Sequence, residues 1–130
     1  YNRRIAMENI NNQEQKNEKV ADNIISERKQ QIYQIEDRID SEKNKLNKIS
    51  DIEDNFIALN KSLNRCIELV SSSVKSKKNT YMYEDMHISN NTLLNRVSNT
   101  LDEERDAVNK NIKNLYSEKS KIEDETKEKE

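Results

Sequence analysis

The side chains best suited to catalysis are few in this sequence. His87 is its only histidine and Cys66 its only cysteine. A serine or cysteine nucleophile needs a neighbouring base, and here that base would have to be His87. Cys66 lies at helical spacing within the apolar stretch 63–70, where a lone cysteine is more often a small packing residue than a reactive thiol. We therefore expect no catalytic residues and a protein that is not an enzyme.

The charged clusters also indicate solvated surface and not a bound cofactor. The acidic runs 103–104 and 123–125 contain carboxylates alone, whereas a zinc site needs three or four suitably placed ligands. The lysines of residues 75–78 form a basic group too short for a convincing phosphate site. The net charge of −2 argues against nucleic acid, which selects a basic face. We expect no metal and no cofactor.

The composition of the chain indicates which secondary structure positions these side chains. The chain contains no glycine and no proline, the residues that supply tight turns, positive φ angles and helix stops. Charged residues make up 37% of the chain and hydrophobic residues 32%, which suits narrow apolar stripes on long helices better than a compact core. No run approaches the roughly 18 apolar residues of a membrane span. The expected fold is therefore all-α.

The first half of the chain contains one clear heptad pattern. Residues 1–19 carry few apolar side chains and are expected to be weakly ordered. Ile25, Ile32, Ile39 and Leu46 then recur every seven residues, with Ile35 and Ile49 at the companion position. This is the a/d pattern of a helix that packs along another helix. It predicts a long helix over residues 20–75.

The pattern changes phase after Ile49. Ile52, Phe56, Leu59, Leu63, Cys66 and Val70 continue the spacing of three and four residues, but displaced by three positions. Such a slip inside a continuous helix is a stammer. The sequence Ser50-Asp51-Ile52-Glu53 also fits a capping box, which would start a new helix. We favour a continuous or kinked helix, and a break at 49–52 is the alternative.

The second half predicts a loop followed by a helix. Residues 76–90 show no helical period and are expected to form the main loop, whose aromatic residues 81 and 83 either contact a partner or cover the helix ends. Ser89, Asn90 or Asn91 would cap the next helix. Leu94, Leu101, Val108, Leu115 and Ile122 recur every seven residues and predict a helix over residues 91–125. Residues 126–130 should form a frayed tail.

Folding these helices about the 76–90 loop predicts an extended antiparallel hairpin. Its expected core is Phe56, Leu59, Leu63, Leu94, Leu101 and Val108. The end of the second helix would then lie near residue 44, and the residues before it would project or return as a third helix. In the projecting arrangement, the stripe Ile25, Ile32, Ile35 and Ile39 has no internal partner. We therefore expect these four isoleucines to bind another chain.

The last helix, with Leu-Asp-Glu-Glu-Arg at 101–105, and the apolar stretch 56–70 resemble one bacterial family. They are similar to the small α-helical accessory proteins of LXG-type toxins in type VII secretion, which are WXG100-like. This chain has no tryptophan and no glycine, so it lacks the W-x-G turn. The export pattern Tyr-x-x-x-Asp occurs at Tyr33–Asp37 and Tyr81–Asp85, and neither copy follows the last helix. The resemblance implies a partner that binds a helical domain of a toxin and helps to present it for export.

Together these observations predict a non-enzymatic helical partner or targeting chaperone of a larger protein. Its partner would be another helical protein, with an LXG-type toxin and a second small helical protein as candidates. The resemblance implies a cytoplasmic location and export together with the client. The alternative is a structural coiled-coil tether or a homo-oligomeric spacer, which would form a stable oligomer by itself.

Overall fold

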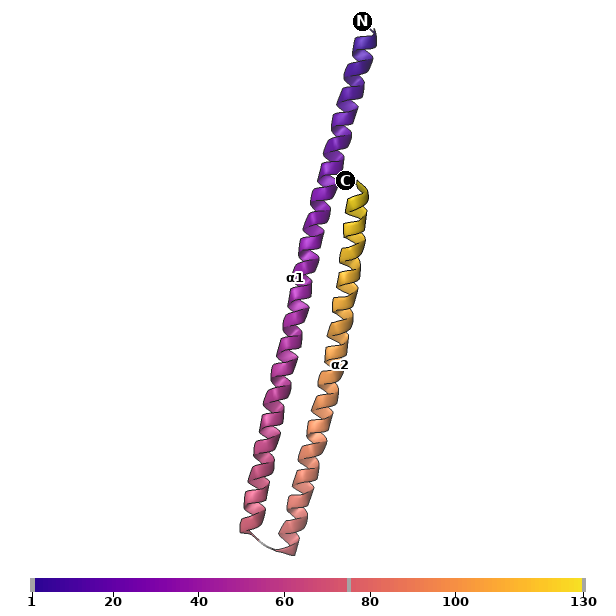
Figure 1. Cartoon of the computed structure of the whole chain (residues 1–130). Helices are drawn as coiled ribbons and strands as arrows, with labels where there is room; N and C mark the ends of the chain where they lie inside the picture. Colours follow the sequence, from indigo (N-terminus) through magenta and orange to yellow (C-terminus); the bar gives the residue numbers. More distant parts are fainter. Residues whose placement is uncertain (1, 75, 130) are drawn as a thin grey trace. The chain divides into compact units, whose positions relative to one another are not determined.

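The chain folds as an all-α helical hairpin. The computed structural model describes residues 2–74 and 76–129. Helix α1 spans Asn2–Ser73 and helix α2 spans Lys77–Lys129 (Figure 1). The described residues contain no strand, no cis peptide bond and no positive φ angle. The predicted fold class is confirmed, and α1 runs without a break through residues 49–52.

A short turn connects the two helices. At the end of α1, the hydroxyl groups of Ser72 and Ser73 donate hydrogen bonds to backbone carbonyls four residues earlier. This bonding competes with the helical ladder and favours a helix end. Ser76 caps α2, because its Oγ accepts a hydrogen bond from the backbone N–H of Asn79 at 3.2 Å. The helix therefore starts at this serine and not at Ser89, Asn90 or Asn91.

The predicted loop at 76–90 is wrong, because residues 77–90 form the first turns of α2. Tyr83 is buried in this stretch, and His87 and Asn90 are half-buried, at the same three-four spacing that leads on to Leu94. The side of α2 that faces α1 therefore continues through residues 77–90, where its side chains are aromatic and polar instead of aliphatic. A search for apolar residues at heptad spacing does not detect such residues.

The earlier turn changes which residues pair across the hairpin. A loop centred in 76–90 would place the end of α2 near residue 44. With α1 ending at Ser73 and α2 beginning at Lys77, Glu125 of α2 instead forms an ion pair with Arg28 of α1, at 3.6 Å. The carbonyl oxygen of Glu125 also accepts a hydrogen bond from Arg28 Nη1 at 2.8 Å. The stretch of α1 that α2 covers is therefore longer than expected.

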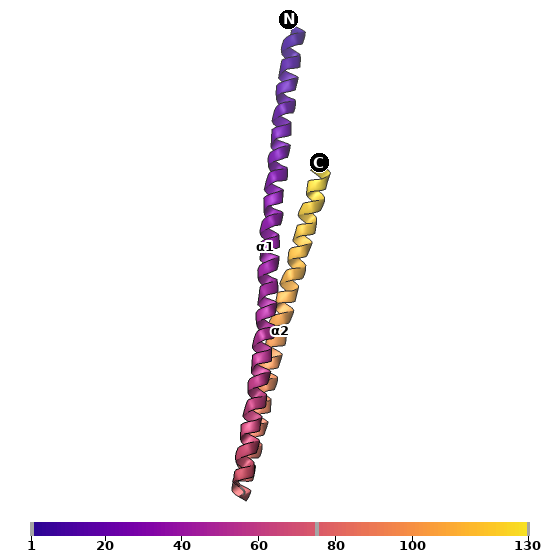
Figure 2. The same cartoon turned by 60° about the vertical axis from the view of Figure 1, so that its left-hand side comes forward.

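The chain divides into two compact units. The turn unit consists of residues 42–111, and the terminal unit consists of α1 up to Ser41 together with α2 from Ile112. Within each unit, the α1 and α2 segments run antiparallel and next to each other (Figure 1), joined by contacts such as Asn60–Asn90 and Arg28–Glu125. In Figure 2, α2 passes behind α1 in the turn unit. Side chains buried between the helices form a narrow seam and not a globular core.

In the turn unit, the predicted phase slip after Ile49 is wrong. One of the two heptad positions turned toward α2 keeps the seven-residue spacing set further up the chain, since Glu53, Asn60 and Ile67 continue it and are all buried or half-buried. Two of these three side chains are polar. The companion position moves by one residue, from the line of Ile49 and Phe56 to Asn64. The displaced apolar stripe lies mainly in solvent, with Ile52, Leu59, Leu63, Cys66 and Val70 exposed.

In the terminal unit, α2 covers the isoleucine stripe of α1. Ile35 and Ile39 are 5% and 3% exposed, and Ile25 and Ile32 are half-buried. α2 stays helical to Lys129, and Thr126 is 7% exposed with its hydroxyl bonded to the Ile122 carbonyl. The expected frayed tail is therefore wrong for residues 126–129, and Glu130 lies outside the described residues.

The start of α1 extends beyond the end of α2 within the terminal unit (Figure 1). It is helical from Asn2 onward, and each side chain described between Arg3 and Val20 is exposed. The expectation of a weakly ordered segment therefore differs from the structure, although the lack of burial agrees with its polar sequence. This part of α1 projects and does not return as a third helix.

Candidate protein-binding surface

The two residues with the greatest chemical potential do not form a catalytic site. Nδ1 of His87 lies 2.8 Å from Oδ1 of Asn64, and because an amide oxygen only accepts, Nδ1 is the donor. Cys66 is exposed and not buried in the seam as its apolar neighbours suggested. The described residues also contain no group of three or more side chains suited to hold a metal ion.

His87 belongs to a polar cluster inside the seam of the turn unit. This asparagine–histidine cluster consists of Asn60, Asn64, His87 and Asn90. Asn60 and Asn90 each donate from Nδ2 to the other's backbone carbonyl at 3.3 Å. Asn90 also donates to Oδ1 of Asn64 at 3.1 Å, and Asn64 donates to Oδ1 of Asn60 at 3.3 Å. Polar groups buried at a helix seam are tolerated when bonded in this way, and they fix pairing register.

A second polar contact crosses the seam nearer to the terminal unit. Nη2 of Arg105 lies 3.3 Å from Oε2 of Glu53, and Nη1 lies 2.6 Å from Oδ1 of Asp102. The Arg105 and Glu53 side chains are both 29% exposed. A pair this accessible contributes little stability, but it places a charged group where the apolar heptad would place a leucine. Sequence reasoning missed both polar contacts because it searched for apolar repeats.

The predicted hairpin core is correct for only part of its members. Val108 is 6% exposed, and Phe56, Leu94 and Leu101 are half-buried. Leu59 and Leu63 are 54% and 45% exposed, so their assignment to the core is wrong. The cause is that one heptad position of α1 continues through Asn60, while its companion position moves by one residue to Asn64 and leaves the two leucines outside.

These leucines lie on one side of the hairpin together with apolar residues of α2. Asn60 and Asn90 lie opposite one another, and an α-helix turns by about 100° per residue. Leu59 precedes Asn60 by one residue and is therefore rotated from it by about −100°. Leu93 follows Asn90 by three residues, a rotation of about 300°, which equals about −60°. Because the helices are antiparallel, rotations of the same sign point both leucines to the same side of the hairpin. The same construction places eight exposed apolar residues there, which we call the apolar side: Ile52, Leu59, Leu63, Cys66, Val70, Met82, Met86 and Leu93.

The opposite side of the turn unit has a different character. The same helical construction places exposed charged residues there: Asp54, Lys61, Glu68, Glu84 and Asp102. On the apolar side, the exposed positions next to the apolar residues include the neutral Ser89 and Thr100 and the charged Lys45, Arg96 and Glu104. The two sides of the turn unit therefore differ in apolar content, and this contrast could not be read from the mixed charge of the whole sequence.

The predicted partner-binding stripe is not a free surface. Ile35 and Ile39 are buried against α2, and Ile25 and Ile32 are half-covered, so the expectation that these four residues await another chain is wrong. Lys119 of α2 reaches across to Glu36 at 3.2 Å. This hydrogen bond, aided by the charges of Glu36 and Glu123, raises the pKa of Lys119. The misplaced loop explains the error, because it left α2 too short to reach these isoleucines.

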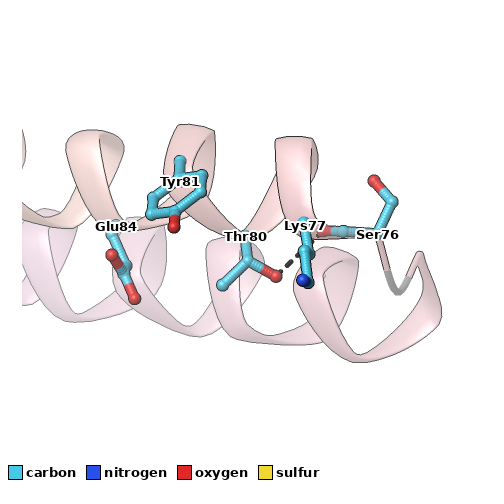
Figure 3. Close-up of a pocket in the computed structure, with 5 residues that line it drawn as sticks. All are labelled: Ser76, Lys77, Thr80, Tyr81 and Glu84. Carbon is cyan, nitrogen blue, oxygen red and sulfur yellow. Dashed lines mark hydrogen bonds between the residues drawn. The ribbon is translucent and has the colours of Figure 1, made fainter.

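An open hollow of about 590 Å³ lies beside the first turn of α2. It is lined by Ser76, Lys77, Thr80, Tyr81 and Glu84 (Figure 3). All five residues are exposed, and the hydroxyl of Thr80 is bonded to the Ser76 carbonyl at 2.9 Å. The hollow is a depression at the helix start and does not enclose a ligand. Tyr81 points into solvent, while Tyr83 is buried in the seam.

Within the described residues, neither helix has a stretch long and apolar enough to cross a membrane. Comparison of the chain with family models, with curated proteins and with solved structures finds no match. The apolar side of the turn unit is the feature of the described residues that most favours binding of another molecule.

Proposed function

We propose that this chain is a non-enzymatic helical partner protein that binds a helical region of a larger protein. The apolar side carries the proposal. Proteins seldom leave a contiguous apolar patch in water unless it contacts another molecule, and here eight apolar side chains from two helices lie on one side. A two-helix surface accepts a further amphipathic helix by the same packing that joins α1 to α2.

The polarity of the two sides supports a protein partner. The apolar side carries a few charged residues among its apolar ones, including Arg96 and Glu104, so a matching helix would present an apolar stripe flanked by complementary charges to it. The charged residues on the opposite side would remain in solvent in the complex, which is the usual arrangement for a helix pair at the edge of a bundle. The expected complex is a small helical bundle.

The client class comes from the family resemblance alone. It suggests an LXG-type toxin as the larger protein, with a second small helical protein in the same complex. On this proposal the chain is made in the cytoplasm, binds the helical domain of the toxin there, and is exported with it. The coiled-coil spacer remains the competing proposal, and it assigns the apolar side to a second copy of the chain.

Co-expression of the chain with the helical domain of a toxin encoded beside it tests the proposal. We expect co-purification of the two proteins and its loss in the double variant Leu59→Asp/Leu63→Asp. The matched control is Tyr33→Asp/Ile88→Asp, in which both altered residues are exposed and lie outside the apolar side. The control should bind as the native chain does.

The mass of the isolated chain separates the two proposals. A partner protein is expected to be monomeric alone, or to aggregate through its apolar side, and to gain solubility with its client. A stable homodimer that Leu59→Asp/Leu63→Asp converts to a folded monomer would instead favour the spacer. Equal client binding by the native chain and by this variant would exclude the apolar side as the binding surface.

A further inference from the structure

Residues 52–70 of α1 carry two stripes that compete for the same place against α2. The first faces α2 and contains the polar Glu53, Asn60 and Asn64 together with the half-buried Phe56, Ile57 and Ile67. The second contains Ile52, Leu59, Leu63, Cys66 and Val70 and faces solvent. The two are offset by about one residue position, so a rotation of this part of α1 by roughly 100° about its axis would exchange them. The second stripe has five apolar residues and the first has three, so on apolar burial alone the second would be expected in the seam.

The residues of α2 opposite this segment explain why the exchange does not occur. His87 and Asn90 point into the seam, and their partners there are Asn60 and Asn64. Rotation of α1 would replace these partners with Leu59, Leu63 and Cys66. The amide of Asn90 and the Nδ1–H of His87 would then lose their hydrogen bonds in a partly dry seam, which is strongly unfavourable.

We infer that the asparagine–histidine cluster is the specificity-determining element of this hairpin, which selects the rotation of α1 that keeps the apolar side outward. Its members on α2 exclude the more apolar packing, and its members on α1 satisfy them in the observed one. The importance of this selection for binding rests on the proposed function. The selection itself is a property of the isolated chain.

Cys66 is a built-in reporter of the rotation. It is the only cysteine, it belongs to the outward stripe, and it is exposed. A maleimide reagent should therefore label the native chain at the rate of an accessible thiol. Burial of the stripe against α2 would slow this labelling, because the reagent then has to wait for local opening.

The test makes one helix apolar at a time. In His87→Leu/Asn90→Leu, α2 no longer penalises the apolar stripe, so α1 should rotate inward and labelling of Cys66 should slow by about tenfold. In Asn60→Leu/Asn64→Leu, His87 and Asn90 lack side-chain partners in either packing, and the stripe that already faces α2 becomes as apolar as the outward one. Rotation then gains no apolar burial, so Cys66 should stay as reactive as in the native chain. The control Asn95→Leu/Asn99→Leu adds the same residues at exposed positions of α2 and should leave the rate unchanged.

The opposite responses of the two double variants distinguish selection from simple stabilisation. Equal labelling of Cys66 in the native chain and in His87→Leu/Asn90→Leu would overturn the inference. Loss of helical circular dichroism in that variant would also overturn it, since the alternative packing would then be unable to hold the hairpin. Both results leave the client-binding experiment free to succeed, so the two proposals fail separately.

Discussion

Asn60 and Asn90 hold each other's backbone. The side-chain amide of each donates to the backbone carbonyl of the other, at 3.3 Å in both directions. A reciprocal bond of this kind forms only when the two residues lie opposite one another, so it fixes the register of α1 against α2. Asn60 is also among the few buried polar residues of the described chain, at 6% exposed.

Replacement of Asn90 by alanine should therefore destabilise the hairpin. The change removes two donated hydrogen bonds and leaves Asn60 and Asn64 short of partners in the seam, which we expect to cost about 1–3 kcal/mol in the free energy of unfolding. Urea denaturation followed by circular dichroism measures the effect. Asn99→Ala, at an exposed position of α2, corrects for the higher helix propensity of alanine, and equal values for both variants would contradict a role for the reciprocal bonds.

Replacement of Ile39 by alanine tests whether α2 covers the isoleucine stripe. Ile39 is buried in the terminal unit, so its truncation should cost about 2–5 kcal/mol in the free energy of unfolding. Tyr33 lies on the same helix but is 71% exposed, and Tyr33→Ala should stay within about 0.5 kcal/mol of the native chain. Hydrogen exchange of the amides of residues 30–40 would show the same contrast. Similar stability of the two variants would mean that the stripe is uncovered.

Replacement of Ser76 by alanine tests the start of α2. Loss of the bond from the Asn79 N–H to the Ser76 hydroxyl should cost about 0.5–2 kcal/mol, the usual value for an N-cap. Ser73→Ala is the matched control, because its hydroxyl only donates to the Leu69 carbonyl within α1. Thermal unfolding compares the two variants. If Ser76→Ala were neutral, α2 would have to begin at another residue.

The carboxyl group of Glu42 should titrate below its ordinary range. The hydrogen bond from Lys45 lowers its pKa most, with a smaller contribution from Asn111. A folded-state pKa below the unfolded one gives stabilisation that is present at neutral pH and lost as the pH falls through the folded pKa. An NMR titration of the native chain and of Lys45→Met measures the shift. The pKa should rise in the variant, and no rise would show that Lys45 is not its cause.

The sequence by itself determined the fold class and much of the seam. Without glycine or proline the chain had few ways to end a helix, so long helices and a hairpin followed from composition. The seven-residue repeats from Ile25 to Leu46 and from Leu94 to Ile122 lie on the paired faces of α1 and α2, since apolar residues at that spacing have to share one side of a helix.

The tertiary structure decided the turn, the register and the exposed surface. Residues 77–90 and Asn60 contribute to the seam through the aromatic Tyr83 and through polar side chains, and the burial of the polar ones depends on a hydrogen-bond partner on the other helix. The spacing of residues within one helix does not show which residue of the other helix supplies that hydrogen bond. The turn was therefore placed too late, Leu59 and Leu63 were assigned to the core, and Ile35 and Ile39 were left without cover. Only the pairing of α1 with α2 showed which stripe is buried and which remains available for another protein.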